Sequence, residues 1–230
     1  MAQPTCEQIV NELTALSDPI GLEVMARFGD RPKKALGGLS APQLKAIAKR
    51  AGRSHALAAD LWATGIYEAR LVATMVDEPA KVTEAQMDAW AVEFDSWAIC
   101  DCCCSYLFDK TPYAYTKAVQ WAERDEEYVK RAGFAMMAVM AVHDKKAPDD
   151  CFVQFLPIIK AHADDSRNFV KKAVNWALRQ IGKRNLALNH AAIETAHEIH
   201  ALPHSAAKWI ASDALRELTG APVQSRLRSR

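Results

Sequence analysis

Amphipathic helical segments recur along this chain at regular intervals, and this recurrence constrains the fold more than any other feature. Apolar residues return at spacings of three and four, and breaks rich in Gly, Pro or Asp follow about every 15 to 20 residues. β-branched residues do not alternate with polar ones, so the sequence favours no strand. We expect helices near residues 5–17, 18–29, from 40 onward, 54–64, 66–76, 83–93, 96–109, 112–123, 125–142, 149–163, 166–184, 187–201 and 205–219.

Internal repeats suggest how these helices are arranged. The tetrapeptide Val129–Ala132 (VKRA) recurs as Val170–Ala173 (VKKA), an offset of 41 residues, and the pattern of the helix near 166–184 recurs 37 residues later. Periods of this length are typical of HEAT-type helical hairpins, which stack into a superhelix. The sequence therefore predicts an all-α, right-handed α-solenoid of HEAT-like helical repeats. Residues 1–220 would form a single domain, and 221–230 would be a disordered basic tail.

The segment Asn168–Lys183 has the clearest division between two helix faces. One face is a continuous apolar stripe that has to be buried. The opposite face places a large aromatic among cations at helical spacing: Lys172, Trp176, Arg179 and Lys183. One interpretation is an indole that covers a neighbouring loop, with solvated cations around it. The other is a surface for a polyanion, where Lys and Arg meet phosphates and Trp meets a sugar or a base.

Charge is distributed unevenly along the chain. The total is +1, which by itself argues neither for nor against nucleic acid. Residues 166–230 contain eleven Lys and Arg against four Asp and Glu, a net charge of +7, which leaves −6 for the remainder. This asymmetry indicates an anionic partner for the C-terminal third.

The cysteines and the N-terminus indicate a cytoplasmic protein. Four of the six cysteines fall within Cys100–Cys104, a spacing unsuited to a disulfide framework. They are expected to be small buried hydrophobic residues. The alternative is a thiolate metal site on the face that Cys100 and Cys104 share. The first ten residues lack the basic and apolar regions of a signal peptide, and no apolar run approaches the length of a membrane span.

Two further helices contain residues with possible chemistry. Trp97 and Asp101 are four residues apart and share a helix face. The carboxylate is either an ordinary surface or capping group, or part of a site beside the indole. Arg131 is followed by Ala at four and seven residues. It either pairs with Glu127 or faces a ligand that approaches over the small side chains.

Together these helices resemble the HEAT-like-repeat DNA alkylation repair enzymes, a family of alkylpurine DNA glycosylases. The resemblance extends over about residues 7–220 and is most specific at three motifs: Trp97-x-x-x-Asp101, Lys130–Ala132, and Asn168–Arg179 followed by Lys183. One departure is Phe28, because some relatives have Tyr at this place.

The resemblance implies excision of cationic N3- or N7-alkylated purines from duplex DNA, without flipping of the base into a pocket. It implies catalytic roles for four residues on one concave surface: Asp101, Trp97, Trp176 and Arg131. The carboxylate would stabilise the sugar cation that forms as the glycosidic bond breaks, and the indole faces would favour that cation. The residues expected to contact DNA are Lys172, Arg179, Lys183, Lys208 and Phe28.

The resemblance also implies the partners of the protein. It would act as a monomer on double-stranded DNA that contains alkylated purines, in the cytoplasm and on the nucleoid, with no membrane partner. No metal or organic cofactor would be needed. The alternative function is a non-catalytic HEAT-like scaffold that binds nucleic acid or protein. Asp101 separates the two, because a groove that only binds DNA has no reason to present a carboxylate to phosphates.

Overall fold

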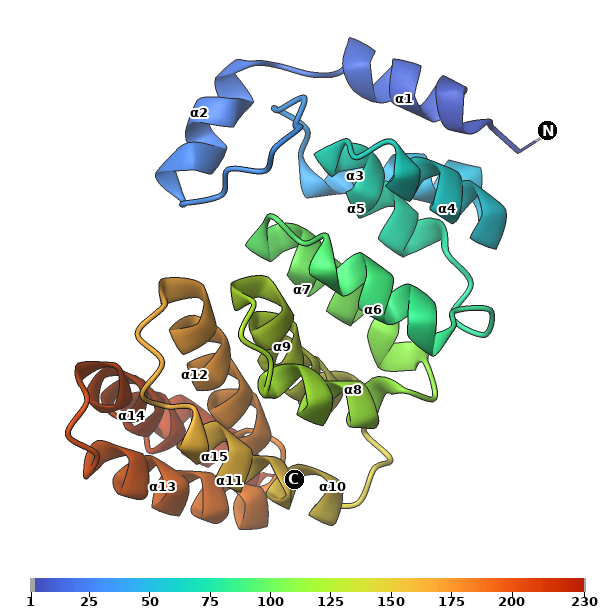
Figure 1. Cartoon of the computed structure of the whole chain (residues 1–230). Helices are drawn as coiled ribbons and strands as arrows, with labels where there is room; N and C mark the ends of the chain where they lie inside the picture. Colours follow the sequence, from blue (N-terminus) through green and yellow to red (C-terminus); the bar gives the residue numbers. More distant parts are fainter. Residues whose placement is uncertain (1–2, 230) are drawn as a thin grey trace. The chain divides into compact units, whose positions relative to one another are not determined.

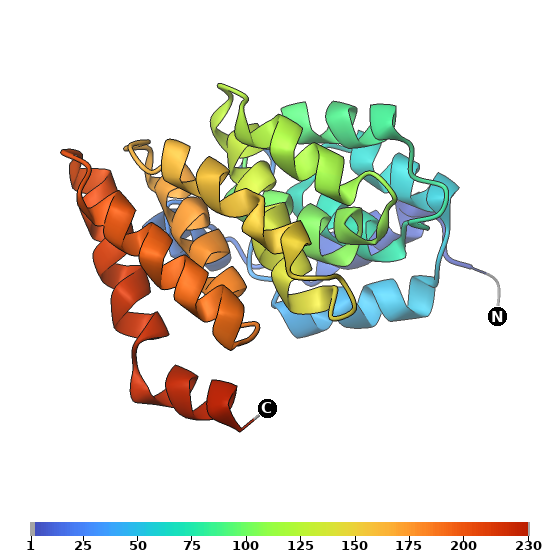
Figure 2. The same cartoon turned by 90° about the horizontal axis from the view of Figure 1, so that it is seen from below.

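The computed structural model describes residues 3–229, and every regular element in that range is a helix (Figures 1 and 2). The all-α prediction is therefore confirmed. Contacts between residues cluster into two compact units, with the boundary between Thr111 and Pro112. Among the described residues, no helix combines the length and apolar character needed to cross a bilayer.

The first unit consists of short helices joined by tight connections. Its elements are α1 (Cys6–Ala15), α2 (Ile20–Arg27), α3 (Ala41–Ala51), α4 (His55–Ala63), α5 (Tyr67–Val76), α6 (Glu84–Val92), α7 (Trp97–Tyr106) and the 3-10 helix η1 (Phe108–Lys110). Local sequence fixes several helix starts. At α1, the Thr5 hydroxyl accepts from the Gln8 amide at 3.2 Å and the Gln8 side chain accepts from the Thr5 amide at 2.9 Å, a reciprocal capping box.

A stack of two indoles forms the centre of the first unit. Trp62 on α4 and Trp90 on α6 lie with ring centroids 3.9 Å apart and planes within 2° of parallel. The Arg70 guanidinium lies 4.7 Å from the Trp62 ring, and Phe94 meets the same ring edge-on at 6.2 Å. Both indoles are buried, so this core fixes α4, α5 and α6 relative to one another. Helix α7 packs against α5.

Helix α2 differs from the rest of the first unit because none of its residues is buried. Ile20 exposes 68% of its surface, and Phe28, directly after the helix, exposes 71%. The start of α2 is held by a glycine loop instead of an apolar core. The Asp18 amide donates to the Gly37 carbonyl at 3.1 Å, and Gly38 has φ +80° at a place where a Cβ would lie 2.7 Å from the Asp18 backbone nitrogen.

The second unit is a series of helical hairpins. Its elements are α8 (Ala114–Ala122), α9 (Glu127–His143), α10 (Asp150–Val153), α11 (Phe155–Ala161), α12 (Asn168–Gly182), α13 (Leu186–His200), α14 (Ser205–Leu218) and α15 (Ala221–Arg228). The second helices of successive hairpins pack side by side, α9 on α12 and α12 on α14. The basic helix near 166–184, α12, is therefore the second helix of a hairpin.

The expected helix at 149–163 is two pieces, α10 and α11, which break at Gln154. Pro157 explains the break. Its ring nitrogen has no hydrogen to donate to the Val153 carbonyl four residues earlier, so the helical ladder is interrupted there.

The prediction of a disordered tail is wrong for residues 221–228, which form α15. Pro222 occupies a favourable early position in this helix, and Val223 and Leu227, four residues apart, are both buried. The Gln224 amide donates to the Leu218 carbonyl at 2.7 Å, which ties α15 to the end of α14. Arg230, the last basic residue of the expected tail, lies outside the described residues.

Candidate nucleic-acid interface

Helix α7 begins at the first residue of the predicted catalytic motif. Ser96 caps it, and the fully buried hydroxyl accepts from the Ala98 amide at 3.1 Å and the Ile99 amide at 3.5 Å. The cap fixes the position of Trp97, the first residue of the helix. Asp101 follows one turn later. Both side chains are half-buried, so the indole and the carboxylate each keep some access to solvent.

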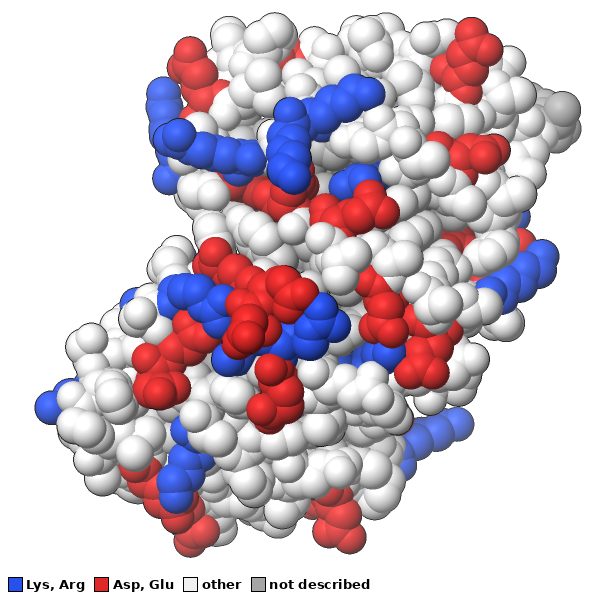
Figure 3. All heavy atoms as spheres, viewed as in Figure 1, with Lys and Arg blue, Asp and Glu red and all other residues white. Residues whose placement is uncertain are grey.

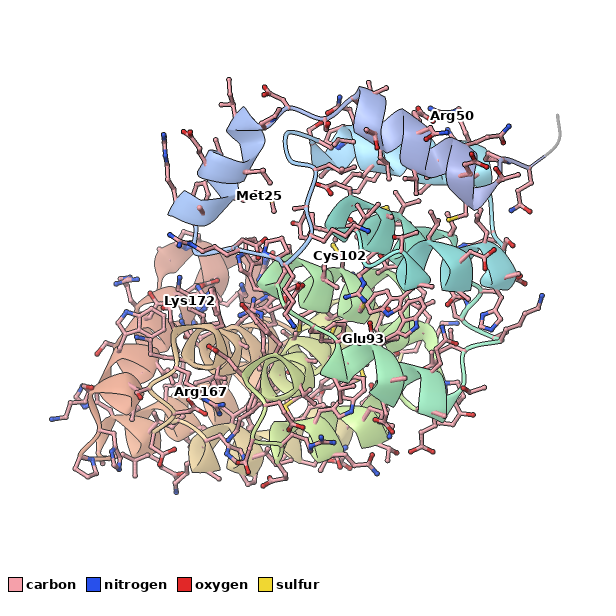
Figure 4. The ribbon with its side chains drawn as sticks, turned by 45° about the horizontal axis from the view of Figure 1, so that its top comes forward. Met25, Arg50, Glu93, Cys102, Arg167 and Lys172 are labelled. Carbon is pink, nitrogen blue, oxygen red and sulfur yellow. The ribbon has the colours of Figure 1, made fainter. Side chains whose placement is uncertain are left out.

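Three of the four cysteines around Asp101 are buried, as expected for small hydrophobic residues. Cys100, Cys103 and Cys104 have no exposed surface, while Cys102, which Figure 4 labels, is half-buried. Burial, followed by the nearby charge of Asp101, raises the pKa of Cys102 to about 12. Within residues 3–229, no group of three or more His, Cys, Asp or Glu side chains is placed so that it could hold a metal ion.

Phe28 lies among cations at the end of α2. We call Arg27, Arg31, Lys33 and Lys34 the basic loop; all four are exposed, and Figure 3 shows blue side chains gathered over α2 and the chain that follows it. Arg27 approaches Glu23 at 4.0 Å, a distance at which an exposed pair contributes little. Lys34 donates to the Thr64 carbonyl at 2.9 Å. Within residues 3–229, the side chains of Arg31, Lys33 and Lys34 form no salt bridge, so their charges are available to an external anion.

Arg131 on α9 is almost completely buried, with 6% of its surface exposed. Its guanidinium donates to the Phe169 carbonyl at the start of α12, 2.7 Å away. Nearby, Lys130 lies 3.6 Å from Asp165, and Arg167 pairs with the same carboxylate at 2.6 Å. Red and blue side chains accordingly interleave over the starts of α9 and α12 in Figure 3. This burial leaves Arg131 little surface for a phosphate, so it positions α12 against α9.

The predicted basic row of α12 is only partly open. Trp176 is half-buried, and Lys172, labelled in Figure 4, is exposed. The two cations toward the C-terminus are paired with an acid from α14. Arg179 lies 2.5 Å from Glu217, and Lys183 lies 2.6 Å from it. Burial opposes ionisation of Glu217, but the hydrogen bond from Lys183 and the two positive charges outweigh it and lower the pKa of the carboxyl.

These contacts belong to a regular ladder between α12 and α14. Its rungs join residues 38 apart: Lys171 with Trp209, Asn175 with Asp213, and Arg179 with Glu217. The rungs themselves are four residues apart along each helix, so they lie on one face. The acids of α14 and Trp209 were not predicted as site residues. The sequence repeat has an offset of 37 residues, whereas the residues that contact each other across α12 and α14 are 38 apart, so the repeat did not reveal these pairs.

The structure places the predicted site residues in two groups. Phe28, Trp97 and Asp101 belong to the first unit. Arg131 on α9, Lys208 on α14 and the four residues of the α12 row belong to the second, and Lys208 is exposed. That both groups line one concave surface stays a prediction.

Comparison with known proteins identifies the family. The family model described as DNA alkylation repair enzyme matches residues 9–218, which spans both units. The chain is 24% identical over 198 residues to the uncharacterized protein Lin0241 of Listeria innocua, covering 85% of this chain and 86% of that protein. It is also similar to a solved structure described as a new family of proteins related to the HEAT-like repeat DNA glycosylases, with affinity for branched DNA structures. That similarity has a TM-score of 0.78 at 20% identity, over 94% of this chain and 96% of the other, and it establishes the HEAT-like repeat fold. The chain belongs to the DNA alkylation repair enzyme family.

Proposed function

We propose that this protein is a DNA glycosylase that removes cationic N3- or N7-alkylated purines from duplex DNA by hydrolysis of the N-glycosidic bond. The observation that supports this best is the Trp97 and Asp101 pair at the capped start of α7, with both side chains half-buried. A half-buried carboxylate keeps access to a substrate while the surrounding protein strengthens its electrostatic effect. The family membership of the chain supports the same class of reaction.

The protein does not need to protonate the leaving base, because an alkylated cationic purine is already a good leaving group. The bond between C1′ and the base nitrogen breaks, and its electron pair neutralises the positive charge of the base. The sugar becomes an oxocarbenium-like cation, which the charge of Asp101 stabilises and the Trp97 face favours. The role of Trp176 rests on the resemblance to the family. Water then adds to C1′ and loses a proton, for which Asp101 is the acceptor. The base stays outside any enclosing pocket.

Phosphate contacts are assigned first to Lys172 and Lys208. Both are exposed, and neither forms an ion pair with another residue of the described range 3–229. Arg179 and Lys183 contribute less, because Glu217 lies between them. Arg131 supports the site by holding the start of α12, where the Trp176 helix begins.

The decisive experiment is single-turnover release of N7-methylguanine, with enzyme in excess. Asp101→Asn keeps the shape of the side chain and removes its charge, so the rate should fall by about 10- to 1,000-fold. Binding to unmodified duplex should be unchanged or slightly tighter, because a negative charge is lost from a DNA surface. Asp60→Asn, an exposed aspartate on α4, is the matched control and should leave both measurements unchanged. Full activity of Asp101→Asn would refute the assignment.

A second candidate is a non-catalytic protein that binds branched DNA. The pairing of Arg179 and Lys183 with Glu217 on α14 favours this second function, because two of the cations expected to contact duplex DNA are already neutralised. The similar solved structure is described as having affinity for branched DNA. If wild-type protein binds DNA well and releases no more base than buffer does, this second function replaces the first.

A further inference from the structure

Trp209 on α14 is more exposed than the other tryptophans of the chain. It exposes 40% of its surface, whereas Trp62, Trp90 and Trp121 expose 6% or less. Trp97 and Trp176, which belong to the proposed glycosylase site, are half-buried. Among the residues described, Trp209 therefore has the largest fraction of an indole surface facing solvent. The ring is not needed to complete the core of its helix, which buries Ala206, Ala207 and Ile210 instead.

The surroundings of Trp209 are cationic. Lys171, its partner in the α12–α14 ladder, places its ammonium 4.8 Å from the centroid of the indole. Such a contact orients the ring and reduces the rotamer freedom that a ligand would otherwise have to restrict. Lys172 and Lys208 are the sequence neighbours of these two residues, and both are exposed.

This end of the ladder contrasts with the other two rungs. Asn175 and Arg179 meet Asp213 and Glu217, whereas Lys171 meets an aromatic ring. Within residues 3–229, Lys171, Lys172 and Lys208 form no ion pair. Their three charges also lie in the first halves of α12 and α14, where the helix dipole adds positive potential. An exposed aromatic ring among unpaired cations is suited to bind a flexible polyanion in which every unit has both a negative charge and an aromatic ring.

We propose that Trp209, Lys171, Lys172 and Lys208 form a binding site for single-stranded DNA. An unpaired base stacks on the indole face opposite Lys171, and the three ammonium groups bind the adjoining phosphates. A base inside a duplex cannot use this platform, because its two faces are already stacked on neighbouring base pairs. The site therefore selects unpaired nucleotides at the end or branch point of a duplex. It deepens the proposed function in that it assumes DNA as the partner, but it requires no base excision.

The test compares two fluorescein-labelled probes by anisotropy: a blunt duplex, and the same duplex with a short single-stranded thymidine overhang. Wild-type protein should bind the overhang probe more tightly. Trp209→Ala should weaken binding to that probe by about 5- to 100-fold, the range found when a stacking aromatic is removed, and should change the blunt duplex by less than about 2-fold. Trp209→Phe keeps a stacking ring and should retain most of the affinity. Leu186→Ala removes a side chain that is also 40% exposed and should affect neither probe.

Salt dependence tests the lysines separately. Lys171→Gln and Lys172→Gln should each lower the log–log salt slope on the overhang probe by about 0.7, the value for one phosphate contact to a single strand. Equal affinity of wild type for the two probes, or an equal loss on both probes in Trp209→Ala, would overturn the site. Thermal unfolding of each variant, followed by circular dichroism, shows that a loss of affinity comes from a folded protein.

The outcomes also distinguish this site from the glycosylase proposal. If wild type releases no alkylated base but Trp209→Ala loses the overhang preference, the proposed function fails and the single-strand site stands. If wild type releases base and Trp209→Ala binds the overhang as wild type does, the single-strand site fails and the glycosylase stands.

Discussion

The basic loop after α2 and the C-terminal half of α12 each present Arg and Lys to the surface, but different groups face those charges. Arg31 and Lys33 are exposed, and among residues 3–229 neither side chain forms a salt bridge, although the Asp95 carboxylate accepts from the Lys33 backbone amide at 2.8 Å. Arg179 and Lys183 lie within 2.6 Å of one carboxylate, Glu217, and Asp213 lies 3.5 Å from Arg179. The second region has the more basic sequence around it, yet its field toward an external phosphate is weaker. What determines an anion surface is therefore the charge that the fold brings opposite each cation.

The largest difference in DNA binding is expected between two double variants, each of which removes one Arg and one Lys from one of the two regions. Arg31→Gln with Lys33→Gln should weaken binding to duplex DNA by about 10- to 100-fold at low salt and flatten the log–log salt slope by about 1 to 2. Arg179→Gln with Lys183→Gln removes the same charges and should change the slope by less than about 0.5, because those cations release few counterions. Salt titrations of the two double variants measure this, and equal slopes would remove the distinction.

A smaller effect is expected when the acid is removed and the cations stay. Glu217→Gln should make Arg179 and Lys183 available to phosphate, so duplex affinity should rise by about 3- to 10-fold and the salt slope should steepen by about 1. Glu198→Gln breaks the exposed pair with Lys160 on another face and serves as the control, with no change expected. If Glu217→Gln weakens binding instead, its carboxylate orients the cations toward DNA and the paired state is the active one.

The smallest effect concerns stability. The pKa of Glu217 is lower in the folded protein than in the unfolded chain, so its pairing adds stability above the ordinary Glu pKa of about 4.3. That contribution is lost as the pH falls through the lowered folded pKa. Urea unfolding between pH 7 and pH 3 should show Glu217→Gln less stable by about 1 kcal/mol at pH 7 and equal to wild type at the acidic end. A constant difference across the range would mean that the side chain acts through packing.

The same contrast shows what could be predicted from the sequence. Helical periodicity located α12 well, because its apolar stripe is a local pattern that burial enforces. The pairing of the α12 cations with Glu217 is not a local pattern. The carboxylate is 38 residues from Arg179, and its position depends on how two hairpins stack. Arg131 illustrates the same limit, because its acceptor is the backbone carbonyl of Phe169, which no side-chain motif reveals. The helix at 221–228 was missed because its buried residues, Val223 and Leu227, are too few to form a periodic pattern.

The thiols beside Asp101 have a consequence for a member of a DNA alkylation repair family. The agents that methylate purines are electrophiles, and a thiolate is normally their best protein target. Three of the four cysteines on α7 have no surface that a reagent could reach. Cys102 is half-buried, and its pKa is raised to about 12, so its thiol stays protonated at pH 7. Four soft nucleophiles thus lie on the same helix as Asp101, the proposed catalytic carboxylate, in a form that reacts slowly with alkylating electrophiles.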